Sequence, residues 1–292
     1  MLTPPLPVSP RLSVCIVTFN RARRLQENLD HLLAEDVPGR EIVVVDGGSR
    51  DETVELLRSY GERVRWISER DRGEYDGWNK AFAFAKGEII KALPDDDSLR
   101  HGACQVALDY FAQHPEVELL WGQAQIWQEN EAGQRTQQQT PVVLDPQKLQ
   151  KQSLLRQQHG LNSVAIFMRK SMLERLGPMR IDLSCGDTEY WVRAADAGVQ
   201  MAIVPDVFVD YVMTGDNGVI TRNWKLSRDV LRINLKYGTP ADIAWTLWNR
   251  RDSLAGVPTI QHEIGKVAQR IGFHPYRWGR ALRQRVQETL KR

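Results

Sequence analysis

Residues 88–97 read EIIKALPDDD, an apolar run that ends on three consecutive aspartates. The run is bounded by Gly87 and Pro94, which predicts a short buried strand. Three carboxylates then stand where the strand leaves its sheet, and because like charges repel, a folded chain seldom gathers them there without a counter-ion. Carboxylate oxygens suit Mg²⁺ or Mn²⁺, which bind through one or two carboxylates together with substrate phosphates. The alternative is a solvated acidic turn in which Asp97 or Ser98 caps the next helix.

The chain before this stretch alternates between strand-like and helix-like segments. Residues 12–18 (LSVCIVT) and 41–45 (EIVVV) are apolar runs typical of buried strands. The leucines of 21–34 share one face of a predicted helix, with Asn20 as its N-cap. Strands joined by helices predict right-handed crossovers and an α/β fold with a mainly parallel sheet. The other segments of this half are a helix over 51–60, a strand over 64–68 and a helix before residue 88.

In sheets of this kind, ligands bind beyond the carboxyl ends of the strands. Polar side chains stand at the end of every predicted strand in this half, and we expect them to line a single cleft. They are Thr18, Asn20, Asp46, Ser68, Glu69, Asp95, Asp96 and Asp97.

The second half predicts more strands and fewer regular crossovers. Residues 128–140 are polar and rich in glutamine, which is typical of a loop or a hairpin tip. The predicted strands are 117–127, 161–168 and 201–211, and the predicted helices are 99–114, 170–176 and 187–197.

Charge divides the chain into two parts. Residues 220–292 hold 15 Lys and Arg against 5 Asp and Glu, a balance of +10, whereas the rest of the chain carries −8. We expect a main domain over 1–219 and a basic helical segment over 220–292, with two functions or with one function performed near an anionic surface. Composition is that of an ordinary globular protein, and we expect no nucleic-acid partner.

Three widely spaced cysteines form no paired or zinc-binding pattern, which favours a reducing compartment. The start is too rich in proline for a signal peptide, and no apolar run approaches the ~18 residues of a membrane span. These features predict a cytoplasmic protein.

Five segments of the chain carry a resemblance to a known family: LSVCIVTFNRARRL, EIVVVDGGSRDET, SERDRGEYDGWNKAFAFAKGEII, LPDDD and GDTEYWVRAADAG. Together they resemble a family 2 inverting glycosyltransferase with the GT-A fold, a Rossmann-like α/β fold. The resemblance covers roughly residues 11–215, and the segment GEYDGWNKA is most like bacterial enzymes that build exopolysaccharide, O-antigen or capsule. It implies transfer of one sugar from a nucleotide-sugar donor to a glycan or a lipid-linked saccharide, with inversion.

The resemblance also implies a metal site and a base. Asp95 and Asp97 match the family's DxD pattern for Mn²⁺ or Mg²⁺, and Asp96 is a candidate direct ligand in this DDD variant. Asp187 matches the base that takes the proton of the acceptor hydroxyl, with Glu189 as the second candidate. Capping of the helix is the alternative role for Asp187.

Nucleotide contacts are implied for Thr18, Asn20, Asp46, Asp71 and Asn79. Many relatives have a second aspartate after the one at position 46, where this chain has glycine. Since that carboxylate contacts a uracil in some relatives, the sequence does not identify the donor nucleotide.

Each of two further features allows two interpretations. Trp78 either stacks on a ligand or packs in the core, and 215–218 (GDNG) is either a closing loop or a plain turn.

Two other functions agree less well with the sequence. A sugar nucleotidyltransferase should carry a glycine-rich phosphate loop after its first strand, but residues 18–25 (TFNRARRL) contain no glycine. A catalytically silent glycan-binding or scaffolding relative is disfavoured because both Asp97 and Asp187 are present.

Residues 275–292 have apolar side chains at helical spacing with arginines between them. This pattern predicts an interfacial helix that binds an anionic membrane surface, at the inner face of the membrane where a lipid-linked acceptor is reached. The alternative is that the apolar stripe packs on the protein itself.

Overall fold

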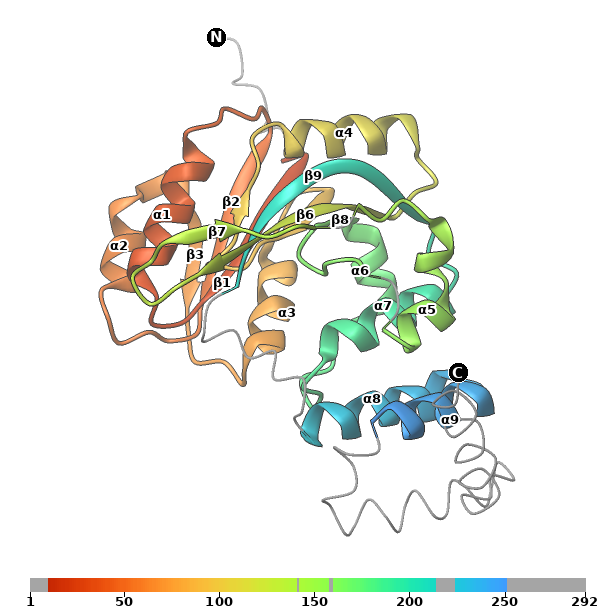
Figure 1. Ribbon diagram of the computed structural model, residues 1–292. Coiled ribbons are helices and arrows are strands. Elements are labelled where there is room, and N and C mark those ends of the chain that lie inside the picture. Colours follow the sequence, from red (N-terminus) through yellow and green to blue (C-terminus); the bar gives the residue numbers. More distant parts are fainter. Residues whose placement is uncertain (1–9, 141, 158–159, 214–223, 251–292) are drawn as a thin grey trace. The chain divides into compact units, whose positions relative to one another are not determined.

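The computed structural model describes residues 10–140, 142–157, 160–213 and 224–250 (Figure 1). The chain divides into two compact units, Met1–Val219 and Ile220–Arg292. The first unit contains the sheet and the helices that cover it.

The sheet has nine strands within the described residues, in the order β3-β2-β1-β4-β8-β6-β9-β5, with β7 paired to β6. The pairings make six of them, β1, β2, β3, β4, β6 and β9, run in one direction. This confirms the predicted α/β fold with a mainly parallel sheet. The strands are Leu12–Thr18 (β1), Arg40–Asp46 (β2), Arg65–Ser68 (β3), Ile89–Ala92 (β4), Ser98–Leu99 (β5), Leu119–Glu129 (β6), Arg135–Gln137 (β7), Ile166–Arg169 (β8) and Met201–Met213 (β9).

The register aligns the polar ends of the first three strands. Thr18 of β1 pairs with Asp46 of β2, and Asp46 pairs in turn with Ser68 of β3. The chain steps from β1 outward to β3 and then returns to β4 on the other side of β1. Because the strand order changes direction between β1 and β4, a crevice forms at their carboxyl ends, which is where α/β sheets bind ligands.

Helices cover both faces of this half of the sheet (Figure 1). Helices α1 (Ala22–Leu33), α2 (Thr53–Ser59) and α4 (Ala103–Gln113) share one apolar core with alternate residues of β1. Helix α3 (Glu74–Phe84) lies against the other face, where the Sγ of Cys15 donates to the carbonyl of Ala81 at 3.8 Å. Burial on both faces explains why β1 and β2 are continuously apolar.

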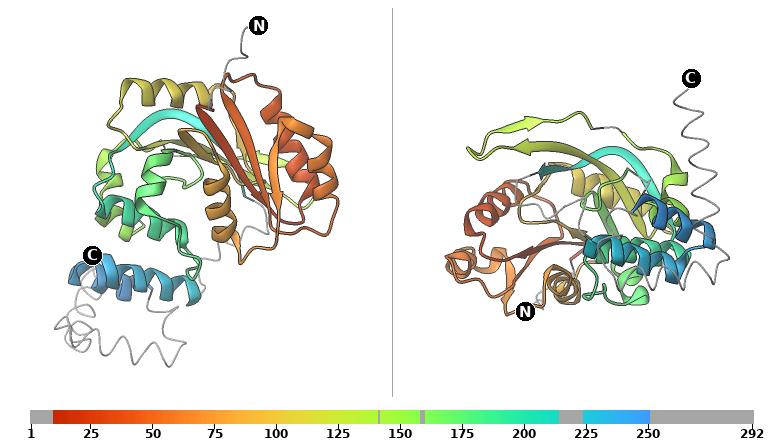
Figure 2. Two further views of the ribbon diagram at one scale, coloured as in Figure 1. Left: turned by 180° about the vertical axis from the view of Figure 1, so that it is seen from behind. Right: turned by 60° about the horizontal axis from the view of Figure 1, so that its bottom comes forward.

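The second half of the sheet is centred on β6, which pairs with β7, β8 and β9. Its hairpin with β7 confirms the predicted hairpin tip, and Figure 2 shows how far this hairpin extends. Close packing beside β9 requires Gly122, because a Cβ there would lie 2.2 Å from the ring of Phe208. The short helices of this half are α5 (Lys151–Leu155), α6 (Lys170–Leu176) and α7 (Gly186–Asp196), with 3₁₀ turns at Gly61–Arg63 and Pro146–Leu149.

The helix cap predicted for Asn20 is wrong, and the cap considered as the alternative for Asp97 or Ser98 is not formed. Asn20 does not cap α1: its backbone has a left-handed φ of 53°, and its Oδ1 accepts from the backbone N–H of Arg50. The backbone N–H of Ala22 at the start of α1 bonds Asp51 instead, at 3.2 Å. The acidic run does not cap α4 either, since the N-cap of that helix is Gly102.

The described part of the second unit consists of α8 (Trp224–Tyr237) and α9 (Pro240–Asn249). Helix α9 begins with a capping box in which Thr239 and Asp242 each accept from the other's backbone N–H. None of the helices in the described residues has both the length and the apolar character that crossing a bilayer requires. The predicted interfacial helix at 275–292 lies outside the described residues.

Candidate functional site

The crevice between β1 and β4 is closed by a charged network. The hydroxyl of Thr18 donates to Asp95 Oδ2 at 2.6 Å, which joins the ends of the two strands. Arg21, at the start of α1, reaches back with Nη1 to Asp95 Oδ1 at 3.0 Å and Asp96 Oδ2 at 2.9 Å. The acidic run therefore has its counter-ion in a guanidinium that is 37% exposed. Sequence reasoning assigned no role to Arg21.

Asp97 differs from its two neighbours because it is turned into the protein and is 1% exposed. Its Oδ1 accepts from the backbone N–H of Val212 in β9 at 3.0 Å, and its Oδ2 has no partner among the described residues. Burial, followed by the charge of Asp96, raises the pKa of Asp97 well above its usual value. Burial also raises the pKa of Asp95, although Thr18 and Arg21 act against it.

Lys91 is a fully buried cation in β4 beneath this run. Its ammonium donates to the carbonyls of Ala92, at 2.7 Å, and Val164. Burial lowers the pKa of Lys91 to about 7, while the nearby charge of Asp97 acts to raise it. The sequence shows a lysine inside the apolar run EIIKAL, which could have indicated a buried cation, but sequence reasoning gave it no role.

Asp46, at the end of β2, is occupied by its own loop. It is fully buried and accepts from the backbone N–H of Ser49 at 3.0 Å and from the hydroxyl of Ser68 at 2.6 Å. The hydroxyl of Ser49 donates to its other oxygen. Asn20 binds the same loop through Ser49 and Arg50. Both residues therefore shape the wall of the crevice.

Asp71 fills the space that the glycine at position 47 leaves open. A Cβ at Gly47 would lie 2.6 Å from Asp71 Oδ2 and 3.4 Å from the ring of Phe19. The ring of Phe19 is 54% exposed, which is unusual for a large apolar side chain. An exposed aromatic ring beside a carboxylate can bind a flat, polar ring, and sequence reasoning gave Phe19 no role of its own.

Asn79 lies away from this group. Its Nδ2 donates to the carbonyl of Met179 at 2.9 Å, and its Oδ1 accepts from the backbone N–H of Met179 at 2.7 Å. The amide therefore fixes the loop that leads into α7, and the structure does not bring it to Thr18, Asp46 or Asp71.

Asp187 lies in the first turn of α7, whose N-cap is Cys185 and has no side-chain cap bond. Its Oδ1 accepts from the hydroxyl of Tyr75 of α3 at 3.1 Å. A Cβ at Gly186 would lie 2.9 Å from the ring of Tyr75, so this glycine allows the contact. Glu189 is 1% exposed and bound to Arg193 at 3.0 Å. Asp187 is therefore the accessible carboxylate of the pair, and capping is not its role.

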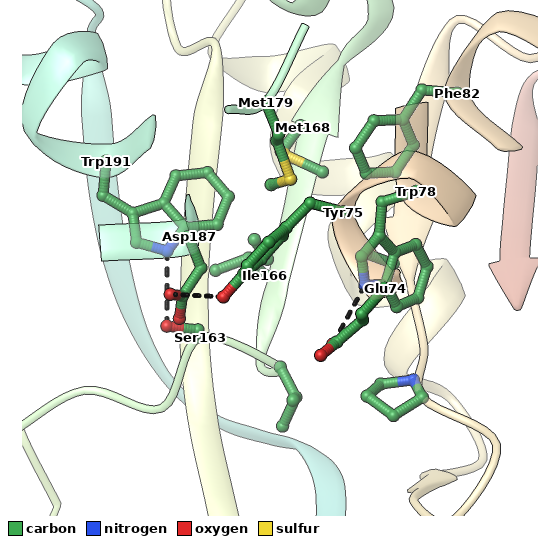
Figure 3. Close-up of a pocket in the computed structure, with 13 residues that line it drawn as sticks. Glu74, Tyr75, Trp78, Phe82, Ser163, Ile166, Met168, Met179, Asp187 and Trp191 are labelled. Carbon is green, nitrogen blue, oxygen red and sulfur yellow. Dashed lines mark hydrogen bonds between the residues drawn. The ribbon is translucent and has the colours of Figure 1, made fainter. Parts of the chain in front are cut away.

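Beside Asp187 the structure has a pocket of about 100 Å³ (Figure 3). Trp78 lies in its wall, and its indole N–H donates to Glu74 Oε1 at 3.2 Å. Burial raises the pKa of Glu74, and the charges of Asp187, Asp96 and Asp95 add to this effect. Pro94, the residue before Asp95, lines the same pocket as Glu74 and Asp187, so the acidic run after β4 and the carboxylate of α7 lie at one site.

The described residues contain no cluster of three or more His, Cys, Asp or Glu that could hold a metal ion by itself. A site of two carboxylates completed by substrate phosphates would not form such a cluster. The Oδ2 of Asp97, which has no partner among the described residues, and the carboxylate oxygens of Asp95 and Asp96 are hard ligands of the kind that a small divalent cation prefers. The expected closing loop at 215–218 lies outside the described residues.

Comparison with known proteins gives one family. The family model described as Glycosyl transferase family 2 matches residues 13–177. A PGL/p-HBAD biosynthesis glycosyltransferase of Mycobacterium bovis is 32% identical over 119 residues, which are 39% of this chain and 46% of that protein. Glycosyltransferase AglE of Haloferax volcanii is 26% identical over 210 residues, 68% of this chain and 66% of that protein. The matched part thus spans about half the length of the mycobacterial relative.

Two solved structures share the fold. S. aureus TarS 1-349, in complex with UDP-GlcNAc, has a TM-score of 0.61 at 17% identity and covers 81% of this chain and 71% of its own. The mannosyltransferase PcManGT from Pyrobaculum calidifontis, in complex with GDP-Man and Mn²⁺, has a TM-score of 0.57 at 19% identity, with coverages of 93% and 83%. Identities this low show likeness of fold.

Proposed function

The chain belongs to glycosyltransferase family 2, and we propose that it moves one sugar from a nucleotide-sugar to a hydroxyl of a glycan or lipid-linked saccharide, with inversion and a divalent cation. The observation that carries this proposal is the meeting of two kinds of carboxylate at one site. Asp95, Asp96 and Asp97 follow β4 and Pro94, and Pro94 lines the same pocket as Asp187 of α7, a separate element. Transfer requires both an anion-binding side and a proton acceptor.

The nucleotide side of the proposal uses the ends of β1 and β2. Phe19 offers an exposed face for a base, and Asp71 offers a carboxylate that accepts its N–H groups. Thr18, Asn20 and Asp46 hold the backbone around them. Complexes of the two fold relatives with UDP-GlcNAc and GDP-Man support a nucleotide-sugar as the donor.

The cation, Mn²⁺ or Mg²⁺, would be held by Asp96 and Asp97, with Asp95 beside them. When bound, it supplies positive charge that neutralises the diphosphate as the diphosphate departs. Arg21 adds a second cation whose guanidinium is already within hydrogen-bond distance of Asp95 and Asp96. The Mn²⁺ in the PcManGT complex supports this choice of ion.

The base in this proposal is Asp187. The bond between the sugar C1 and the diphosphate oxygen breaks, its electron pair leaves with the nucleoside diphosphate, and a new bond forms from C1 to the acceptor oxygen. The proton of that hydroxyl passes to the carboxylate of Asp187. Tyr75 orients this carboxylate through its 3.1 Å hydrogen bond, which leaves lone pairs for the incoming hydroxyl.

A donor screen tests the proposal. The full chain is incubated with nucleotide-sugars, with and without Mn²⁺, and both thermal stability and hydrolysis of the donor are measured. A cognate donor at 100 times its dissociation constant adds about 2.7 kcal/mol of linked stability. We expect one donor to stabilise the protein in a Mn²⁺-dependent way and to be slowly hydrolysed.

Asp187→Asn is the test variant in this screen, and Asp36→Asn, at an exposed position, is its matched control. Hydrolysis should fall in the first and persist in the second. Donor binding without any hydrolysis by the unaltered chain would favour the silent glycan-binding relative, and the absence of donor binding would refute the proposal.

A further inference from the structure

The pocket beside Asp187 has an apolar interior below a polar rim. Met168 of β8 and Met179 of the loop before α7 point their sulfurs into it, and the rings of Trp78 and Trp191 form opposite walls (Figure 3). Asp187 and Glu74 contribute the carboxylates of the lining. The two sulfurs and the proposed base therefore line the same pocket.

The polar atoms of the interior are already engaged. The indole N–H of Trp191 donates to the hydroxyl of Ser163 at 3.3 Å, and the hydroxyl of Tyr75 donates to Asp187. The indole N–H of Trp78 donates to Glu74. A water molecule needs two to four polar partners to stay in a buried site. Away from the two carboxylates the lining is mainly aromatic, aliphatic and thioether, so an apolar group is the favoured occupant of that part of the pocket.

The size of the pocket limits the occupant to a small group. Its volume of about 100 Å³ leaves room for a group of a few heavy atoms. An apolar protein cavity that holds benzene measures about 150 Å³. A methyl or acetamido group with the ring edge that carries it fits the smaller volume, whereas an aromatic ring is too large.

We propose that this pocket receives a methyl group carried by the acceptor sugar, either the C6 methyl of a 6-deoxyhexose or the methyl of an acetamido group. This inference rests on the proposed function, because it takes Asp187 as the group that meets the acceptor hydroxyl. The rim carboxylates of Asp187 and Glu74 accept hydroxyl hydrogens, and the methyl group enters the apolar interior below them. A sugar that bears both kinds of group satisfies both parts of the pocket.

Two pairs of glycosides distinguish the two sources of the methyl group. Methyl 6-deoxy-α-mannoside is compared with methyl α-mannoside, and methyl N-acetyl-β-glucosaminide is compared with methyl β-glucoside. Saturation-transfer NMR on the full chain measures the dissociation constant of each glycoside and the protons closest to the protein. In one pair the methyl-bearing member should bind at least about fourfold more tightly, which is the effect of burying one methyl group. The saturation should be strongest at that methyl group.

Ala92→Leu and Met179→Phe place extra atoms in the pocket, and each should abolish the preference. Ala132→Leu makes the matched change at an exposed turn and should preserve it. Thermal unfolding of each variant identifies any that does not fold, and the second filling variant replaces the first in that case.

Two results would overturn the inference: equal binding within both pairs, or a preference that survives both filling variants. A preference that appears among nucleotide-sugars instead, as UDP-GlcNAc over UDP-glucose, would assign the pocket to the donor and also contradict it. Failure of the proposed function is a separate result, because glycoside binding is measured without a donor, whereas the proposed function fails when no donor is bound.

Discussion

The two sides of the site are built on opposite principles. At the ends of β1 and β4, charged and hydroxyl groups bind one another: Thr18 and Arg21 hold Asp95, and Arg21 also holds Asp96. Below Asp187, the pocket is lined by aromatic rings and thioethers, and only its rim is charged. The first arrangement suits an anionic ligand whose charge must be balanced, and the second suits a neutral ligand recognised by shape.

This difference predicts which function a substitution on each side of the site affects. A change on the charged side should alter ion and nucleotide binding, whereas a change beside the pocket should alter turnover or acceptor binding. Variants on the two sides should therefore give different patterns of effect, and each of the following changes can break that division.

The largest effect is expected for Asp187→Asn. Loss of a general base lowers turnover by about 10²–10⁴-fold, and donor binding should stay nearly unchanged because the nucleotide contacts lie on the other side. Steady-state kinetics and donor titration measure the two quantities. Glu189→Gln is the control: it is buried against Arg193, so it should lower stability instead. Collapse of donor affinity in Asp187→Asn would place this residue on the charged side.

Asp97→Ala should be the next largest change and should act on the fold as well as on the ion. It removes the acceptor of the Val212 N–H and a carboxylate whose charge favours the ammonium form of the buried Lys91, and an unsatisfied buried group costs about 1–3 kcal/mol. Urea unfolding should show this loss for Asp97→Ala and little loss for Asp96→Ala. Mn²⁺ affinity should fall in both. Equal stability of the two variants would contradict the different roles assigned to these aspartates.

Arg21→Ala should raise the affinity for Mn²⁺ when no nucleotide is present. The guanidinium lies against the carboxylates that would hold the ion, and repulsion between unit charges 4 Å apart is ~1 kcal/mol even in water. Calorimetry should therefore give at least about fivefold tighter Mn²⁺ binding. Arg23→Ala removes an exposed arginine on the same helix and should leave Mn²⁺ binding unchanged. An unchanged value for Arg21→Ala would remove this arginine from the charged network.

The smallest effect is expected for Asn79→Ala. Two hydrogen bonds to Met179 are lost at a partly exposed position, so the cost in stability should be about 1 kcal/mol. Because these bonds hold the loop that leads into α7, acceptor binding should weaken while donor affinity stays the same. A change confined to donor affinity would return Asn79 to the nucleotide side.

The charged side was largely predictable from the sequence, and the pocket was not. Thr18, Asp46 and the three aspartates each follow an apolar run directly, and parallel strands bring their carboxyl ends together. Tyr75, Met168, Met179 and Trp191 come from four separate segments, and only the folded chain shows that they share a cavity. Arg21 and Lys91 were also missed, because a sequence does not show which cation reaches a buried carboxylate.

Local capping was the prediction for Asn20 and the alternative for Asp97, because both residues precede predicted helices. In the structure each binds a distant backbone N–H instead, that of Arg50 for Asn20 and that of Val212 for Asp97. Tertiary hydrogen bonds thus replaced the local ones. Asn79 illustrates the same point, since its amide holds a loop about one hundred residues further along the chain.

The most direct test of this account is the position of Mn²⁺ in a crystal of the full chain with Mn²⁺ and the donor found in the screen. Anomalous scattering locates the ion without reference to the rest of the density. The account predicts one peak at about 2.0–2.3 Å from a carboxylate oxygen of Asp96 or Asp97, with the diphosphate bound to the ion and the sugar C1 facing Asp187. A bound donor whose ion lies elsewhere, or whose sugar faces away from Asp187, would contradict it.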